Sequence, residues 1–326
     1  MVNFVEKLRR DAPDRFLAAL ALALAFAGFV TVDQIHWWQM RSDYAFGWLV
    51  PILAVFVVLE RWPRLTALFK SGGPSPMPRW LKLLFAAAAG IVLVGGLTIF
   101  LLGAVYRGGA GSSQPGSLAL AVGYSGMLLG IVFLNVPEGR VGGASKGWRA
   151  IGADVQLRAA ALFLFPALIW ILSAPLVTAV ENAVSLFLLR KVVVVVFAIF
   201  GLLGYPLIQE GNVLILPHGQ VGVADACSGI RSLTGCLFAG SFLAAVFLDR
   251  MWQKVALVFA SLVLAFFTNL LRSLFLTGWA YAYGSDAIEG KIHDATGWVI
   301  LGLTSIGLFC ILPLLRPNNW RRWFGS

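Results

Sequence analysis

The chain contains 326 residues, of which 59% are hydrophobic and 12% are charged. This composition excludes an ordinary soluble domain and is typical of an integral membrane protein surrounded by lipids. The formal net charge of +10 does not indicate nucleic-acid binding, because most basic residues lie in short loops between apolar runs, where they set membrane orientation. We therefore expect membrane lipids, and no nucleic acid, as partners.

Eight apolar runs have about the length that a helix needs to cross a bilayer. They cover approximately Phe16 to Ile35, Ala45 to Leu59, Leu81 to Val105, Ser117 to Val136, Ala159 to Val180, Ile230 to Leu248, Val255 to Leu276 and Thr296 to Leu315. No clear small-residue cleavage site follows the first run, so we expect no cleaved signal peptide. The sequence predicts an all-α integral membrane protein with about eight transmembrane helices, folded as a single polytopic domain over residues 1–326.

A ninth apolar run, Val184 to Leu203, carries Arg190 and Lys191 near its middle. Paired charges at bilayer depth are costly, so this run is predicted to be an interfacial helix on the outer face. The following stretch, Gly204 to Val223, mixes Gly, Pro and β-branched residues in rough alternation. That pattern predicts a small extended hairpin on the same membrane surface.

The distribution of basic residues predicts the orientation. With eight spans, 18 of the 25 Lys and Arg residues fall on the side that holds both termini. The positive-inside rule then makes both termini cytoplasmic, as in a multi-pass protein of the inner (plasma) membrane. Cys227, Arg272 and His293 consequently lie at the outer, extracytoplasmic face.

Cys227 is the candidate nucleophile. It comes two residues after Asp225 and directly before Ser228, and it stands at the predicted outer start of a helix, where free backbone N–H groups and the helix dipole favour a thiolate. Cys236 and Cys310 lie inside apolar runs and are interpreted as inert. The sequence has no Cys-x-x-Cys pair or Cys/His cluster, so we expect no metal site and no cofactor.

Two arginines and an asparagine are candidate supporting residues. Arg231 follows Cys227 by four positions, on the same helix face, where it favours the thiolate, binds a carboxylate or simply snorkels to the headgroups. Arg272 lies near the end of an otherwise uncharged span, with Asn269 three residues earlier on its face. Ionisable residues inside membrane spans are functional candidates.

His293 begins the last span and shares the predicted outer surface with Cys227 and Arg272. A histidine at a helix start is often only a solvated loop residue. In a Cys/His pair, however, the imidazole takes the thiol proton and returns it to the leaving amine. We therefore expect Cys227, Arg272 and His293 to be catalytic.

In order and spacing, three motifs resemble the Cys, Arg and His motifs of the exosortase/archaeosortase family. They are ACSGIRSL at Ala226 to Leu233, NLLRS at Asn269 to Ser273 and HDATG at His293 to Gly297. SDYAFGWLVPIL, at Ser42 to Leu53, is similar to the early motif of the family, except that Phe46 stands where the family usually has His.

The resemblance implies a membrane cysteine protease or transpeptidase that needs no cofactor. Its partners would be exported proteins with a C-terminal sorting signal of the PEP-CTERM kind, which consists of a short motif, a transmembrane helix and a basic tail. Cys227 would attack the peptide just outside the bilayer and form a thioester, which an amine or water then resolves.

Three alternatives remain. A small transporter or channel with an outward-facing Arg/His site would carry charges in several spans, whereas the first four spans are almost free of ionisable residues. A thiol oxidoreductase would need a resolving cysteine near Cys227, and Cys236 lies deeper on the same predicted helix. A protease that only hydrolyses differs from a transpeptidase in the nucleophile that reaches the thioester, which the sequence does not determine.

Overall fold

A computed structural model describes residues 10–71, 73–142, 148–217, 219–222, 230–288 and 290–316. The chain divides into two compact units, Met1–Leu176 and Val177–Ser326. The stretch predicted to carry the catalytic motifs, residues 204–315, lies in the second unit. The single polytopic domain over residues 1–326 therefore stays a prediction.

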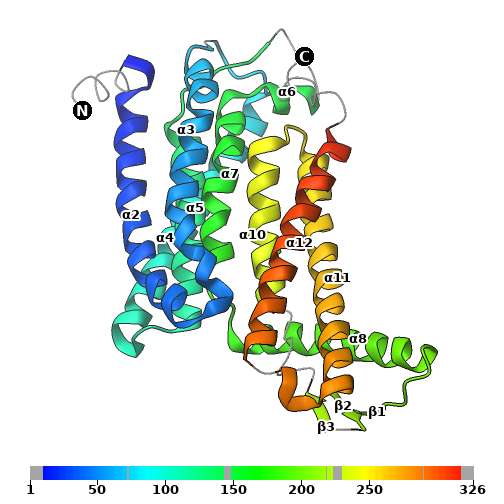
Figure 1. Ribbon diagram of the computed structural model, residues 1–326. Helices are drawn as coiled ribbons and strands as arrows, with labels where there is room; N and C mark the ends of the chain where they lie inside the picture. The colour runs from blue at the N-terminus through cyan, green and yellow to red at the C-terminus, as the bar shows by residue number, and fades with distance from the viewer. Residues whose placement is uncertain are drawn as a thin grey trace. The chain divides into compact units, whose positions relative to one another are not determined.

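Helices make up nearly all of the described structure, as the sequence predicted (Figure 1). Among the described residues, nine helices are long and apolar enough to cross a membrane. The chain is therefore an all-α, multi-pass membrane protein. The first unit contains α2 (Asp14–Met40), η1 (Ser42–Leu49), α3 (Val50–Phe69), α4 (Arg79–Ala110), α5 (Gln114–Asn135), α6 (Trp148–Ala153) and α7 (Val155–Ser173).

Glycines let α4 and α5 pack with their backbones in close contact. A Cβ atom added to Gly96 of α4 would lie 2.8 Å from the carbonyl oxygen of Gly123. A Cβ atom on Gly123 of α5 would lie 2.5 Å from the backbone nitrogen of Phe100. Small residues at helix contacts are a common means of association inside membranes, where the hydrophobic effect contributes little.

The first unit contains buried charges that the sequence analysis did not single out. Asp33 of α2 is fully buried, and its carboxylate lies 2.7 Å from Nε of Arg107 in α4. The buried Arg61 of α3 donates to the carbonyl oxygen of Leu162. An apolar cavity of about 410 Å³ in this unit is lined by uncharged residues. Asp33, Arg107 and Arg61 are thus bound to protein groups and do not line this cavity.

The early motif forms η1 and the start of α3. Tyr44 is buried, and its hydroxyl accepts a hydrogen bond from the Leu176 N–H at 3.0 Å. Phe46 lies against Tyr44, with ring centroids 6.4 Å apart. Gly47 lies under the indole of Trp38, where a Cβ atom would come within 2.1 Å of Nε1. The motif therefore needs glycine at position 47 for packing.

The second unit contains α8 (Thr178–Leu202), β1 (Ile208–Glu210), β2 (Val213–Leu216), β3 (Gly219–Gly222), α10 (Ile230–Phe247), α11 (Met251–Tyr283), η2 (Ser285–Ile288) and α12 (Lys291–Leu315). The predicted span that ended at Val180 was too long. Helix α7 ends at Ser173 because Pro175 disfavours helical backbone at the residue before it and cannot continue the helix. A new helix, α8, begins at Thr178.

Helix α8 is the run that the sequence analysis assigned to the interface. It meets the length and hydropathy criteria for a span. In Figure 1, however, it runs crosswise to α10, α11 and α12 of the same unit. Arg190 and Lys191 are both exposed. Its placement at a membrane surface stays a prediction, which the crosswise direction favours.

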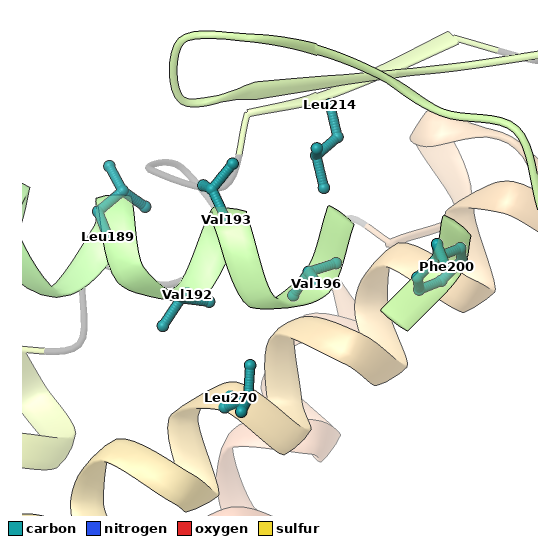
Figure 2. Packing of buried hydrophobic residues seen from close by; sticks show 7 residues of the cluster. All are labelled: Leu189, Val192, Val193, Val196, Phe200, Leu214 and Leu270. Carbon is teal, nitrogen blue, oxygen red and sulfur yellow. The ribbon is translucent and has the colours of Figure 1, made fainter. Parts of the chain in front are cut away.

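Apolar residues hold α8 between the sheet and α11. Figure 2 shows Leu214 of β2 on one side of α8 and Leu270 of α11 on the other. The other members of this buried cluster, Leu189, Val192, Val193, Val196 and Phe200, all come from α8. The helix is therefore buried on two sides, as its long valine run requires.

The predicted hairpin is a three-stranded sheet. Strands β1, β2 and β3 are antiparallel in the order β1-β2-β3, with Glu210 opposite Val213 and Leu216 opposite Gly219. Gly211 makes the first turn with φ of +61°, a backbone conformation that favours glycine. A second turn follows β2, so the prediction of two strands was one strand short.

Candidate active site

Arg272 of α11 and His293 of α12 are in direct contact. Nη2 of Arg272 lies 2.9 Å from Nε2 of His293 and donates to the backbone carbonyl oxygen of His293 at 3.3 Å. The two helices are consecutive long helices joined through the short η2 segment. Two sequence motifs that are 21 residues apart therefore meet at one point.

A polar contact one turn from Arg272 links the same two helices. The Thr304 hydroxyl of α12 lies 3.2 Å from the Thr268 hydroxyl of α11, and both residues are buried. Hydrogen bonds between helices are worth about 1 kcal/mol in membranes. This contact helps to fix the position of α12, and thus of His293, against Arg272.

Arg272 and His293 lie at one end of a cavity of about 340 Å³ that is formed by α10, α11 and α12. Along α12 the lining extends from His293 to Leu308, a distance of about 22 Å at the helical rise per residue. The lining is made by Arg231, Ser232, Gly235, Cys236, Ala239, Arg272, His293, Gly297, Trp298, Ile300, Leu301, Thr304, Ser305 and Leu308. It is charged at one end and mainly apolar or small elsewhere.

The structure thus brings three predicted site residues, Arg231, Arg272 and His293, into one cavity. Asn269 is different, because it is 4% exposed and does not line this cavity. Its Oδ1 atom has no hydrogen-bond partner among the described residues.

The remaining predicted residues, Asp225, Cys227 and Ser228, lie outside the described part of the chain. Their roles stay predictions. In the sequence, Cys227 precedes the first described residue of α10 by three positions.

Sequence reasoning missed most of the apolar lining. Cys236, interpreted as an inert core thiol, is 5% exposed and belongs to the lining, together with Ser232 and Ala239 of α10. The available signal was helical spacing: on α12, positions three, four and seven residues apart continue the face of His293. This signal shows which residues share a face, but not that the face borders a cavity.

The charged end of the cavity is cationic. Its described lining contains two arginines and one histidine, and neither Asp nor Glu. Arg272 forms no ion pair with a described carboxylate, and its Nε atom is buried without a hydrogen-bond partner among the described residues. Such an end can bind an anionic or strongly polarised group.

A comparison with protein families identifies a match. The model of the family described as Transmembrane exosortase (Exosortase_EpsH) matches residues 37–310, most of the chain. The matched range includes the early motif and the Cys, Arg and His motifs. No curated protein and no solved structure matches the chain.

Proposed function

This chain belongs to the transmembrane exosortase family, a family of membrane sorting enzymes, and from that premise we propose that it cleaves C-terminal sorting signals of exported proteins. The signal is a short motif followed by a transmembrane helix and a basic tail. Cys227 is the nucleophile, and the reaction passes through a thioester. The chemistry needs no metal and no organic cofactor.

One observation carries the proposal: Arg272 and His293 meet in a cavity that also contains Arg231. Arg231 follows Cys227 by four positions in the sequence, and four residues of chain span at most about 14 Å. A thiol, an imidazole and a guanidinium are therefore available within a small region. These are the groups that acyl transfer by a cysteine nucleophile requires.

In the first proposed step, the Cys227 thiol gives its proton to His293, and the thiolate attacks the carbonyl carbon of the scissile peptide bond. An S–C bond forms, and the C–N bond then breaks. The leaving amine takes the proton from the imidazolium. Arg272 orients the substrate or stabilises the negative oxygen of the tetrahedral intermediate.

In the second step, an amine or water attacks the thioester and releases Cys227. His293 now removes a proton from the attacking nucleophile and returns it to the thiolate sulfur. Arg231, Asn269, Ser228 and Asp225 are proposed to bind substrate or support the site.

We propose that one face of the apolar helix of a sorting signal packs along this cavity. The cavity begins at the polar end and continues for about 22 Å along α12. Small residues such as Gly235, Ala239 and Gly297 allow another backbone to approach closely. A helix bound there would bring the peptide that precedes it to Arg272 and His293.

The proposed location is the inner (plasma) membrane, with the active site on the extracytoplasmic side and both termini cytoplasmic. The support is the basic-residue distribution, with 18 of 25 Lys and Arg on the side of the termini. Exported substrates would reach such a site after translocation.

The test is processing of a co-expressed exported protein that carries a sorting signal. Cys227→Ala is expected to abolish processing while the protein remains in the membrane at normal abundance. Cys236→Ala and Cys310→Ala are matched thiol controls, one buried and one exposed, and should retain activity. Normal processing by Cys227→Ala would contradict the covalent mechanism.

The transporter alternative gains no specific support. In the second-unit cavity, the described ionisable side chains Arg231, Arg272 and His293 gather at one end, and the lining along α12 continues through Ile300, Leu301 and Leu308. A polar path through a membrane would require polar groups along its whole length.

A further inference from the structure

Helix α8 has one face that the described part of the second unit leaves uncovered. The opposite face carries the buried leucine, valine and phenylalanine side chains that pack against β2 and α11 (Figure 2). The exposed residues recur at intervals of three and four, which places them on one stripe of the helix. This stripe contains Leu186, Phe187, Arg190, Val194, Phe197 and Gly201.

The stripe is apolar on both sides of its centre. Phe187 and Val194 are 61% and 55% exposed, and Leu202, which directly follows the stripe, is 87% exposed. Large apolar side chains that gather at the surface mark a contact with another protein or with a membrane. The uncovered face of α8 is therefore a contact surface.

Two neighbouring cations lie at the centre of this face. Arg190 and Lys191 are both exposed, and neither forms an ion pair with a described carboxylate. The ammonium group of Lys191 lies 5.8 Å from the centre of the Phe187 ring, so its hydrocarbon stem follows the apolar surface. Between Asn182 and Leu202 the sequence contains no Asp or Glu. The partner of this face must therefore offer both apolar groups and negative charge.

A bilayer surface offers both, and it suits α8 better than the bilayer interior. Arg190 and Lys191 stand in the middle of the 25 residues of α8. A span would place them at its centre, where a basic side chain is most costly. On a helix that lies in the interface, they reach the headgroups while the apolar side chains enter the acyl region. The crosswise direction of α8 relative to α10, α11 and α12 agrees with this placement (Figure 1).

We propose that the uncovered face of α8 binds anionic phospholipids of the bilayer surface. Its apolar side chains lie between acyl chains, and Arg190 and Lys191 bind the phosphate groups. A guanidinium binds phosphate through two parallel hydrogen bonds, and the neighbouring ammonium group adds a second positive charge. Adjacent basic side chains favour lipids with a net negative charge over zwitterionic lipids, whose headgroups carry their own cation.

The lipid contact also bears on the depth of the candidate active site. Helix α8 packs against Leu270 of α11, and Arg272 follows Leu270 by two residues on the same helix. A helix held at headgroup level therefore holds Arg272 near that level. The lipid contact does not rest on the proposed function, so either can fail alone.

The first test is native mass spectrometry of the full-length protein in a maltoside detergent. The protein is titrated with phosphatidylglycerol or with phosphatidylcholine of the same acyl chains. The double variant Arg190→Gln/Lys191→Gln removes both charges, and Arg190→Lys/Lys191→Arg retains them. A matched control, Arg15→Gln/Lys70→Gln, removes two exposed cations from the first unit.

The wild type is expected to bind a phosphatidylglycerol molecule more tightly than phosphatidylcholine. Each basic side chain near an anionic surface strengthens binding about fivefold, so the Arg190→Gln/Lys191→Gln protein should bind phosphatidylglycerol about 30-fold more weakly. Its phosphatidylcholine binding should not change, and the charge-retaining variant and the control should bind as the wild type does. Unchanged phosphatidylglycerol binding by Arg190→Gln/Lys191→Gln, or an equal loss in the control, would overturn the proposal.

The second test measures the depth of α8 in lipid nanodiscs that contain phosphatidylglycerol. Val194→Cys, in a chain whose three native cysteines are replaced by alanine, carries a fluorophore. Lipids with a nitroxide close to the headgroup should quench it strongly, and lipids with a nitroxide near the end of the acyl chain should quench it weakly. Stronger quenching from the chain end would mean that α8 crosses the bilayer. Quenching by neither lipid would mean that a protein surface, such as a second copy of the chain, covers the stripe, and both results contradict the proposal.

Discussion

Gly47 offers a prediction whose size follows from the structure. A methyl group at this position would lie 2.1 Å from Nε1 of Trp38 and 2.3 Å from two further ring atoms. Trp38 is 2% exposed, and its Nε1 donates to the carbonyl oxygen of Ser173 at 3.2 Å. In Gly47→Ala, the indole must therefore move.

Two costs follow. Overpacking of a well-packed core costs about 1–3 kcal/mol. Displacement of the indole leaves a buried N–H and a buried carbonyl without partners, which costs about 1–3 kcal/mol more. Alanine restricts the unfolded chain more than glycine does, which stabilises the folded protein by about 0.4–1 kcal/mol and offsets part of these costs. We expect Gly47→Ala to lower the free energy of unfolding by about 2–5 kcal/mol.

The assay is unfolding of the purified protein by SDS titration, followed by far-UV circular dichroism. Gly28→Ala is the matched control, because a methyl group on Gly28 of α2 would meet nothing within 4 Å. That variant should be as stable as the wild type or slightly more stable. Wild-type stability of Gly47→Ala would refute the packing explanation.

Three further predictions concern catalysis, stability and topology. His293→Ala should reduce substrate processing on the order of 10²-fold or more, because it removes the proton transfer. Arg272→Lys should be almost as inactive as Arg272→Ala, because an ammonium group lacks the planar fork of guanidinium. Near-normal processing by Arg272→Lys would contradict this. Asp154 is fully buried, and its carboxylate lies 3.1 Å from the ammonium group of Lys82. Asp154→Ala leaves that charge without its partner and should lower the free energy of unfolding in SDS titration by about 3–5 kcal/mol. In intact cells, an impermeant maleimide should label Ser285→Cys and not Ser326→Cys, and the reverse result would invert the topology.

The number and position of the apolar helices could be predicted because bilayer thickness sets the length of each run. Helix ends were predicted less well. Helix α11 continues past the predicted end at Leu276 to Tyr283, where Phe275, Trp279 and Tyr283 stack along one face. Amphipathic aromatic residues continue a helix beyond the hydrocarbon region, where a hydropathy criterion no longer detects it.

The candidate site was predictable in its residue types but not in its geometry. A short connection between two consecutive helices brings Arg272 and His293 onto neighbouring helices, which the sequence indicates. The contact between Nη2 and Nε2 depends on side-chain rotamers, which no sequence pattern encodes. Helix α8 illustrates the same limit, because its valine run is typical of a span and only its packing between Leu214 and Leu270 shows its crosswise direction.

The central claim is a thioester on Cys227, and capture by hydroxylamine tests it most directly. Purified protein is incubated with a sorting-signal substrate and increasing hydroxylamine, and the new C-terminus of the product is identified by mass spectrometry. A thioester predicts a hydroxamate whose share rises with hydroxylamine concentration, with Cys236→Ala unchanged and no product from Cys227→Ala. A product that always ends in a carboxylate at saturating hydroxylamine, or any processing by Cys227→Ala, would contradict the mechanism.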